Sequence, residues 1–172
     1  MYNYSKLPEH IRGGVQRYIE EGIPPGDFLK AVICNNLKES FARADDINIS
    51  RMFDIVEFFY NEVPGICWGS ELDYKQWLNI CYLRKTLKPG TQIIYQPKHV
   101  KTLDHPDCEK GFVTSIAPDR LSAFCRYWNY DGSDLRTKAN SEATWLNDLI
   151  IENTHPQKKV DEWIKKINEE KK

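Results

Sequence analysis

Residues 87–95 read Leu-Lys-Pro-Gly-Thr-Gln-Ile-Ile-Tyr, and the hydrophobic pattern of the chain changes within this stretch. Pro89 and Gly90 stop the helical spacing that precedes them. Residues 91–95 favour a strand, because Ile and Tyr are enriched in strands. The stretch therefore predicts an α+β protein, with a helical domain over residues 1–86 followed by a β-rich domain.

Apolar residues at helical spacing predict four or five short helices before residue 87, packed as a compact bundle. Pro8 suits a first helical turn, and Gly22 suits the left-handed position just after a helix. Asn35-Asn36 indicates a break or cap, Asp45-Asp46 indicates another helix start, and Pro64-Gly65 indicates a stop. The clearest apolar stripe consists of Met52, Phe53, Val56, Phe59, Tyr60 and Val63, and it predicts a helix.

Three runs rich in β-branched and aromatic residues predict strands at 91–95, 111–116 and 121–128. Residues 117–120, Ala-Pro-Asp-Arg, predict the turn between the last two of these strands. Shorter runs at 135–138 and 149–151 are candidates for the remaining strands. Short strands at this spacing predict a small SH3-like β-barrel over residues 87–155, which is short for the alternative OB-like barrel.

The last segment, residues 156–172, predicts an amphipathic C-terminal helix. Val160, Trp163, Ile164 and Ile167 follow the i, i+3, i+4, i+7 pattern, and lysines and glutamates fill the other positions. We expect Trp163 to dock this helix onto one of the two domains.

The composition is that of an ordinary globular protein, with 28% charged residues and a formal net charge of −1. A duplex-DNA binder usually carries an excess of basic residues, so nucleic-acid binding by this chain would need a local basic patch. The chain has five cysteines, an odd number, and we find no apolar run of signal-peptide or membrane-spanning length. These features predict a cytoplasmic protein with reduced cysteines and no membrane partner.

Two cysteine-containing segments were considered as chemical sites. His105 and Cys108 have the spacing of a zinc-ligand pair, with His99 and Cys125 as further ligands, but we find no C-x-x-C pair. Residues 67–70, Cys-Trp-Gly-Ser, superficially resemble a thiol-protease turn, yet no histidine is near them in the sequence. We interpret Cys67 and Trp68 as buried in a loop between helices. We also find no glycine-rich nucleotide loop, and we predict no metal, no cofactor and no catalytic residues.

A cluster of basic and aromatic residues is the main candidate for a binding surface. It begins with Arg126-Tyr127-Trp128-Asn129-Tyr130 and continues downstream. Such residues can stack on bases and contact phosphates, or anchor a protein partner. Alternation along a strand places Tyr127 on the face opposite Arg126 and Trp128, so some of these side chains belong to the core. The candidate binding residues are Arg126, Trp128, Tyr130, Arg136, Lys138 and Trp145.

Most of the chain resembles small proteins of bacterial viruses. Residues 7–44, continued by Asp45-Asp46, Tyr60-Asn61-Glu62 and Cys67-Trp68-Gly69, resemble a family of small uncharacterised proteins in tailed-phage and prophage genomes. Residues 88–90, 105–111 and 147–150 are similar to a second group of short phage proteins with an SH3-like character. The resemblance carries no functional residue over, but it implies a viral accessory protein that works in the bacterial host cytoplasm.

Three functions follow as hypotheses. The first is a phage accessory protein that binds a host protein and inhibits a defence effector, such as a CRISPR–Cas component; proteins of that kind are anti-defence or anti-CRISPR inhibitors. The second is a nucleic-acid-binding module that uses the SH3-like barrel. The third is an enzyme acting on a nucleotide signal, which no motif specifically supports. A homodimer also stays open, because symmetric dimers are the commonest assembly.

Overall fold

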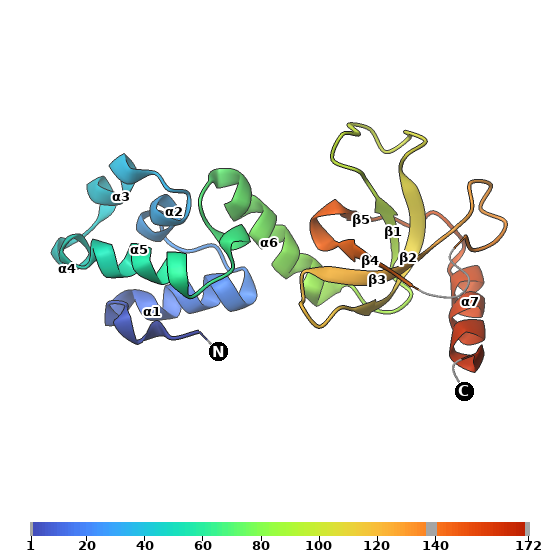
Figure 1. The fold of residues 1–172 in the computed structure, drawn as a ribbon, viewed down its shortest axis with the longest axis horizontal. Coiled ribbons are helices and arrows are strands. Elements are labelled where there is room, and N and C mark those ends of the chain that lie inside the picture. Colours follow the sequence, from blue (N-terminus) through green and yellow to red (C-terminus); the bar gives the residue numbers. More distant parts are fainter. Residues whose placement is uncertain (1, 137–140, 171–172) are drawn as a thin grey trace. The chain divides into compact units, whose positions relative to one another are not determined.

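The computed structural model describes residues 2–136 and 141–170, and its helices and strands are traced in Figure 1. The chain divides into two compact parts, Met1–Tyr82 and Leu83–Lys172, which we call the N-terminal unit and the C-terminal unit. The first is helical, and the second contains an antiparallel sheet and a further helix. The predicted α+β class is therefore confirmed.

The N-terminal unit consists of short helices joined by tight connections. Its described elements are η1 (Tyr4–Lys6), α1 (Glu9–Gln16), η2 (Arg17–Glu21), α2 (Asp27–Ile33), α3 (Leu37–Arg43), α4 (Asp46–Ser50), α5 (Met52–Asn61), η3 (Gly65–Cys67) and most of α6 (Glu71–Thr86).

Polar caps and one glycine set the ends of these helices, as the sequence predicts. Asn36 accepts a hydrogen bond from the Glu39 amide at 3.2 Å, and Asp45 accepts one from the Asn48 amide at 2.7 Å. Gly22 ends the first helical segment with φ 67°, a conformation that glycine adopts at no steric cost.

The core of this unit forms around Tyr18, Cys67 and Trp77. The Tyr18 hydroxyl donates a hydrogen bond to the Cys67 carbonyl at 2.5 Å, and the Trp77 indole donates to the Tyr18 carbonyl at 3.2 Å. Cys67 is buried, as predicted, whereas Trp68 is only half-buried. Burial raises the pKa of the Cys67 thiol to about 12, so this sulfur is a packing group rather than a nucleophile.

Helix α5 differs from its sequence pattern in the face that it buries. An apolar stripe normally faces the core, yet Phe53, Val56 and Tyr60 of the predicted stripe are exposed. The buried residues of α5 are Ile55, Phe58 and Phe59. The helix is apolar on two faces, and the spacing alone does not show which face the bundle covers.

The C-terminal unit contains five antiparallel strands in the order β4-β3-β2-β1-β5. The central pairings are unambiguous, because Ile93 of β1 lies opposite Gly111 on one side and Ile151 on the other. The described elements after α6 are β1 (Gln92–Tyr95), β2 (Glu109–Ile116), β3 (Ser122–Tyr127), β4 (Glu142–Trp145), η4 (Leu146–Asp148), β5 (Leu149–Ile151) and α7 (Gln157–Glu170).

Four of the predicted strands are confirmed, and one is not where the sequence placed it. Strands β1, β2, β3 and β5 overlap the predicted runs at 91–95, 111–116, 121–128 and 149–151. In the predicted run 135–138, Leu135 forms only an isolated bridge with Trp128, and residues 137–138 lie outside the described part of the chain. The fourth strand is β4, whose sequence Glu-Ala-Thr-Trp is only four residues long and mixes strand-favouring Thr and Trp with Glu and Ala, which strands disfavour.

The sheet curls strongly, although no described strand pairing closes it into a barrel. Strands β4 and β5 occupy its opposite edges, yet only the three residues of η4 connect them. Four Cα–Cα steps reach at most ~15 Å, whereas the outer strands of a flat five-stranded sheet lie ~19 Å apart. An irregularity between Val113 and Ser115 of β2 adds local bending.

Helix α7 covers the sheet through an aromatic cluster. Trp163 stacks on Trp128 with ring centroids 4.7 Å apart, and it lies parallel to Phe112 at 6.5 Å. The buried members of this cluster are Phe112, Trp128, Leu135, Val160, Trp163 and Ile167. The predicted docking of Trp163 is thus confirmed, and Trp163 packs against the sheet of the C-terminal unit.

None of the helices in the described ranges combines the length and the apolar character that crossing a membrane requires.

Candidate functional site

The C-terminal unit contains a cleft of about 580 Å³, a size typical of ligand sites. One wall comes from the β1–β2 connection, including Asp104 and His105, and the other comes from the β3–β4 connection, including Tyr130 and Arg136. Three predicted binding residues line it together: Trp128, Tyr130 and Arg136.

Trp128 forms the floor of the cleft and is largely covered. Its side chain is 5% exposed, because Trp163 stacks on it and the His155 ring lies 4.4 Å from its ring centre. The indole N–H donates a hydrogen bond to Thr154 Oγ1 at 3.4 Å. With both its ring and its donor occupied, Trp128 shapes the cleft and offers little surface to a ligand.

His155 is held beside the floor of the cleft by ring contacts with Trp128 and Trp163 and by two hydrogen bonds. Its Nδ1 lies 3.2 Å from Thr154 Oγ1, and its Nε2 lies 3.3 Å from the Gly132 carbonyl oxygen. Because a carbonyl can only accept, Nε2 carries the proton, and Nδ1 accepts from the Thr154 hydroxyl. Burial lowers the pKa of this ring, and the charges of Lys159 and Lys110 lower it further. A neutral imidazole satisfies all of these contacts.

The β3–β4 connection is held against the start of α7 at Gly132. The Gly132 carbonyl accepts a hydrogen bond from Lys159 Nζ at 2.8 Å in addition to the one from His155. Gly132 has φ 68°, and a Cβ at this position would lie 2.7 Å from His155 Nε2. Only glycine fits without a shift, so this residue sets the position of one cleft wall.

Arg136 is engaged within the protein. Its two terminal nitrogens bind the Glu109 carboxylate at 2.6 and 2.8 Å, and one of them also reaches Glu142 at 3.3 Å. The guanidinium carbon lies 5.7 Å from the Tyr127 ring centre. The hydrogen bonds to Glu109 raise the pKa of Arg136 despite its partial burial. This bidentate pair ties β2 to the β3–β4 connection and stabilises the cleft wall.

Tyr130 is the candidate residue that a partner can reach most directly. Its side chain is 95% exposed at the rim of the cleft. Lys110, on the same cleft, supplies a positive charge. An exposed aromatic ring beside a cation is a combination that anchors protein partners and also stacks on bases.

The other predicted binding residues are placed elsewhere. Arg126 was predicted as a binding residue, but it is only 3% exposed within β3. Tyr127 and Trp128 are buried too, because both faces of the sheet are covered at this point. Trp145 is 52% exposed on the edge strand β4 and does not line the cleft, and Lys138 lies outside the described residues.

Two of the four zinc-ligand candidates, His99 and His105, lie next to Asp107 in the β1–β2 connection. Asp107 Oδ2 lies 3.0 Å from His99 Nε2 and 3.8 Å from His105 Nδ1, and the His99 contact lowers the pKa of the carboxyl. Cys125 is buried in β3. In the ranges that the structure describes, no group of three His, Cys, Asp or Glu side chains is arranged to hold a metal ion.

Cys108 and the histidines of the cleft form no described nucleophile–base pair. The Cys108 sulfur lies 3.5 Å from the Thr102 carbonyl, which is an acceptor. Burial and the charges of Asp107 and Asp104 raise the pKa of the thiol, which keeps it protonated at neutral pH. Both nitrogens of His155 are already engaged.

Sequence reasoning missed several cleft residues, namely Asp104, Glu109, Lys110, Thr154 and His155. They come from segments far from the 126–130 cluster. Gly132 was the one available signal, since an Asp-Gly pair predicts a turn with φ > 0 and hence a fixed loop beside the cluster.

No protein-family model matches this chain, and neither a curated protein nor a solved structure was found to match it.

Proposed function

We propose that this chain is a phage-encoded accessory protein that binds a host protein through the cleft of its C-terminal unit. We further propose that the target is a defence effector, such as a CRISPR–Cas component, which binding inhibits. The observation that carries the binding proposal is the cleft, with the exposed Tyr130 at its rim. The viral origin and the type of target rest on the sequence resemblance alone.

The construction of the cleft supports recognition of a protein segment. Its lining carries both signs of charge, from Asp104, Glu109 and Asp131 and from Lys110 and Arg136. A mixed-charge surface suits a peptide segment with its own polar groups better than a polyanion. The Arg136–Glu109 pair and the Gly132 contacts hold the walls in place, which limits the entropy lost on binding.

We also propose that the sheet is an SH3-like barrel. Support comes from its short strands, its strong curl, and the return of β5 to pair with β1. Small sheets of this kind present ligand sites on the loops between strands, which is where the cleft lies.

The test is a pull-down with the tagged full-length chain from nuclease-treated bacterial lysate, followed by mass spectrometry. We expect one host protein near equal stoichiometry, with recovery reduced at least about tenfold by Tyr130→Ala, since exposed aromatic anchors often contribute more than 1.4 kcal/mol. Trp145→Ala is the matched control, because Trp145 is also exposed but lies outside the cleft. Equal recovery by wild type and Tyr130→Ala would refute the cleft as the binding site.

Nucleic-acid binding by the same cleft is the second candidate function. The observation in its favour is local charge, because residues 83–172 contain sixteen Lys and Arg against thirteen Asp and Glu. This hypothesis predicts that single-stranded oligonucleotides bind with an affinity that falls steeply as salt is raised. Loss of the captured material after nuclease treatment would favour it over protein binding.

A further inference from the structure

Exposed apolar side chains are concentrated in the N-terminal unit, whereas the cleft belongs to the C-terminal unit. Among the described residues, twelve large hydrophobic side chains are exposed, and ten of them lie in residues 1–82. The ten are Ile23, Leu37, Phe41, Ile47, Ile49, Phe53, Val56, Tyr60, Leu72 and Tyr82. Such a concentration is unusual for a surface that only faces water, and it marks interaction sites in soluble proteins.

Three of these side chains form one line along α5. Phe53, Val56 and Tyr60 are 77%, 41% and 75% exposed, and the i, i+3, i+7 spacing places them on a single face. Seven residues of helix extend this line over ~10 Å. Half-buried Trp68 continues it, since its ring centre lies 6.3 Å from that of Tyr60. We call Phe53, Val56, Tyr60 and Trp68 the α5 ridge.

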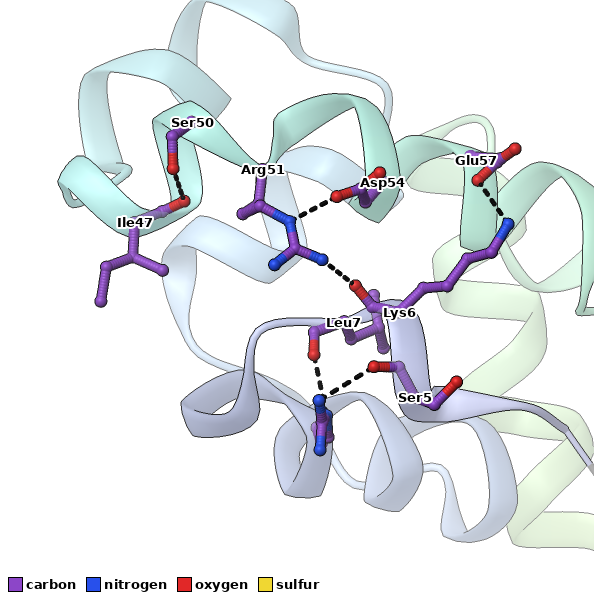
Figure 2. Close-up of polar contacts among 9 residues, drawn as sticks. Ser5, Lys6, Leu7, Ile47, Ser50, Arg51, Asp54 and Glu57 are labelled. Atoms are coloured by element: carbon purple, nitrogen blue, oxygen red, sulfur yellow. Dashed lines mark hydrogen bonds and ion pairs between the residues drawn. The ribbon is translucent and has the colours of Figure 1, made fainter.

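Polar contacts on the flank of α5 hold the ridge in a fixed orientation. Figure 2 shows Arg51 between the Asp54 carboxylate and the Lys6 carbonyl, to which it donates a hydrogen bond at 2.7 Å. One turn further along, Glu57 pairs with Lys6 Nζ at 3.1 Å. These contacts attach α5 to the N-terminal segment through its polar side. The ridge side chains therefore project from a helix that is secured by other residues.

The charge of the N-terminal unit distinguishes between two occupants of the ridge. Residues 1–82 contain eight Lys and Arg against twelve Asp and Glu, a net charge of −4 that remains after Asp54 and Glu57 are paired with Arg51 and Lys6. A second copy would bring two units of like charge together, which is unfavourable. A partner with basic residues beside its apolar residues would gain both apolar burial and charge complementarity.

We propose that the α5 ridge docks an amphipathic helix of another protein, one whose apolar face is flanked by lysine or arginine. Two helices pack by fitting the ridges of one into the grooves of the other, and the large side chains of the α5 ridge supply such a feature. The site is separate from the C-terminal cleft, so the protein has one binding surface in each unit.

The test uses NMR on the isotope-labelled full-length chain with two synthetic peptides of about 20 residues, built from strong helix formers, because isolated helices shorter than about 15 residues are marginal in water. Both have leucines at the same helical positions; one carries lysine and the other glutamate at the polar positions. We expect the lysine peptide to bind saturably and to shift the α5 amides and the Trp68 indole signal. The glutamate peptide should bind at least about tenfold more weakly.

Variants localise the binding. Phe53→Ser and Tyr60→Ser should each lower the affinity for the lysine peptide about tenfold or more, because each removes a large aromatic surface from the interface. Tyr130→Ala, in the other unit, should leave the affinity for the lysine peptide unchanged, which distinguishes this site from the cleft. Conversely, Phe53→Ser should not change the recovery of the host protein that the cleft binds in the pull-down. The two proposals can therefore fail independently.

Three results would overturn the proposal. Equal affinity for the two peptides would show that basic residues do not contribute to binding. NMR shifts confined to residues outside α5 would place the binding site elsewhere. A dimer detected by light scattering, dissociated by Phe53→Ser and unable to bind the lysine peptide, would show that a second copy covers the ridge instead.

Discussion

The two units use aromatic residues in opposite ways. In the C-terminal unit, Trp128 and Trp163 stack in a buried cluster, and among the described residues only Tyr130 and Trp145 are large hydrophobic side chains left exposed. In the N-terminal unit, Phe53 and Tyr60 project into solvent from a helix whose other face is already buried. The difference shows that aromatic content alone does not predict a binding surface. What matters is whether a neighbouring element covers the ring.

The largest expected effect is at the buried aromatic cluster of the C-terminal unit. Trp163→Ala should destabilise the C-terminal unit by about 3–5 kcal/mol, because the substitution leaves a cavity between α7 and the sheet. Hydrogen exchange followed by NMR will measure the effect, with loss of protection expected in β1–β3 and α7. Amides of α1–α5 should keep their protection, since the Trp163 cluster is confined to the C-terminal unit. A uniform loss across the chain would show that the units unfold together.

A smaller effect is expected at the cleft wall. Gly132→Ala should destabilise the protein by about 1–3 kcal/mol, because the residue has a positive φ and its new Cβ would collide with His155. Urea unfolding measures the change. Gly65→Ala is the matched control, since a Cβ there meets nothing within 4 Å, and its effect should stay below about 0.5 kcal/mol. Equal effects at the two glycines would contradict the tight packing at Gly132.

Acidification should weaken the packing of the neutral His155 ring against Thr154 and Gly132. The pKa of His155 is lowered from its ordinary value of 6.5 in the folded protein, so the unfolded chain binds the proton first as pH falls. The neutral His155 ring makes its full contribution to the free energy of unfolding above about pH 6.5. This contribution is lost as the pH falls through the lowered pKa. Between pH 8 and pH 5, we expect wild type to lose up to about 1 kcal/mol more than His155→Gln. Parallel pH profiles of unfolding would count against this role for His155.

The smallest expected effect concerns the uncovered rings. Phe53→Ser and Tyr130→Ala should each change the free energy of unfolding by less than about 0.5 kcal/mol, because both side chains are almost fully exposed. Thermal unfolding of the purified variants checks this. A large destabilisation by Phe53→Ser would mean that the α5 ridge is part of the core in solution.

The sequence predicted element types better than element surroundings. The caps at Asn36 and Asp45 and the stop at Gly22 are local effects of a few residues, so local sequence was sufficient. Strand β4 was missed because the four residues Glu-Ala-Thr-Trp mix strand-favouring and strand-disfavouring types, and the strand is held by its pairing with β3. Pairing of this kind is a tertiary effect that a local pattern does not contain.

The candidate site shows the same limit. Alternation along β3 correctly separates the two faces of a strand, but it does not tell whether each face is covered, and Arg126 and Trp128 proved buried. Tyr130 follows the strand and escapes that cover. His155 and Lys110 reach the cleft from other strands and loops, and no spacing near residue 130 could have indicated them.

The pairing of β1 with β5 has a consequence for synthesis of the chain. Ile93 and Ile151 lie opposite each other, and the Gln92 side chain binds the backbone of Thr154 and His155 at 2.8–3.0 Å. While a ribosome is still adding the residues in between, one hydrogen-bonding edge of β1 therefore has no strand to pair with. An unpaired apolar edge is a template for association with other chains. The nascent protein thus passes through an interval of aggregation risk that ends only when β5 emerges and pairs with that edge.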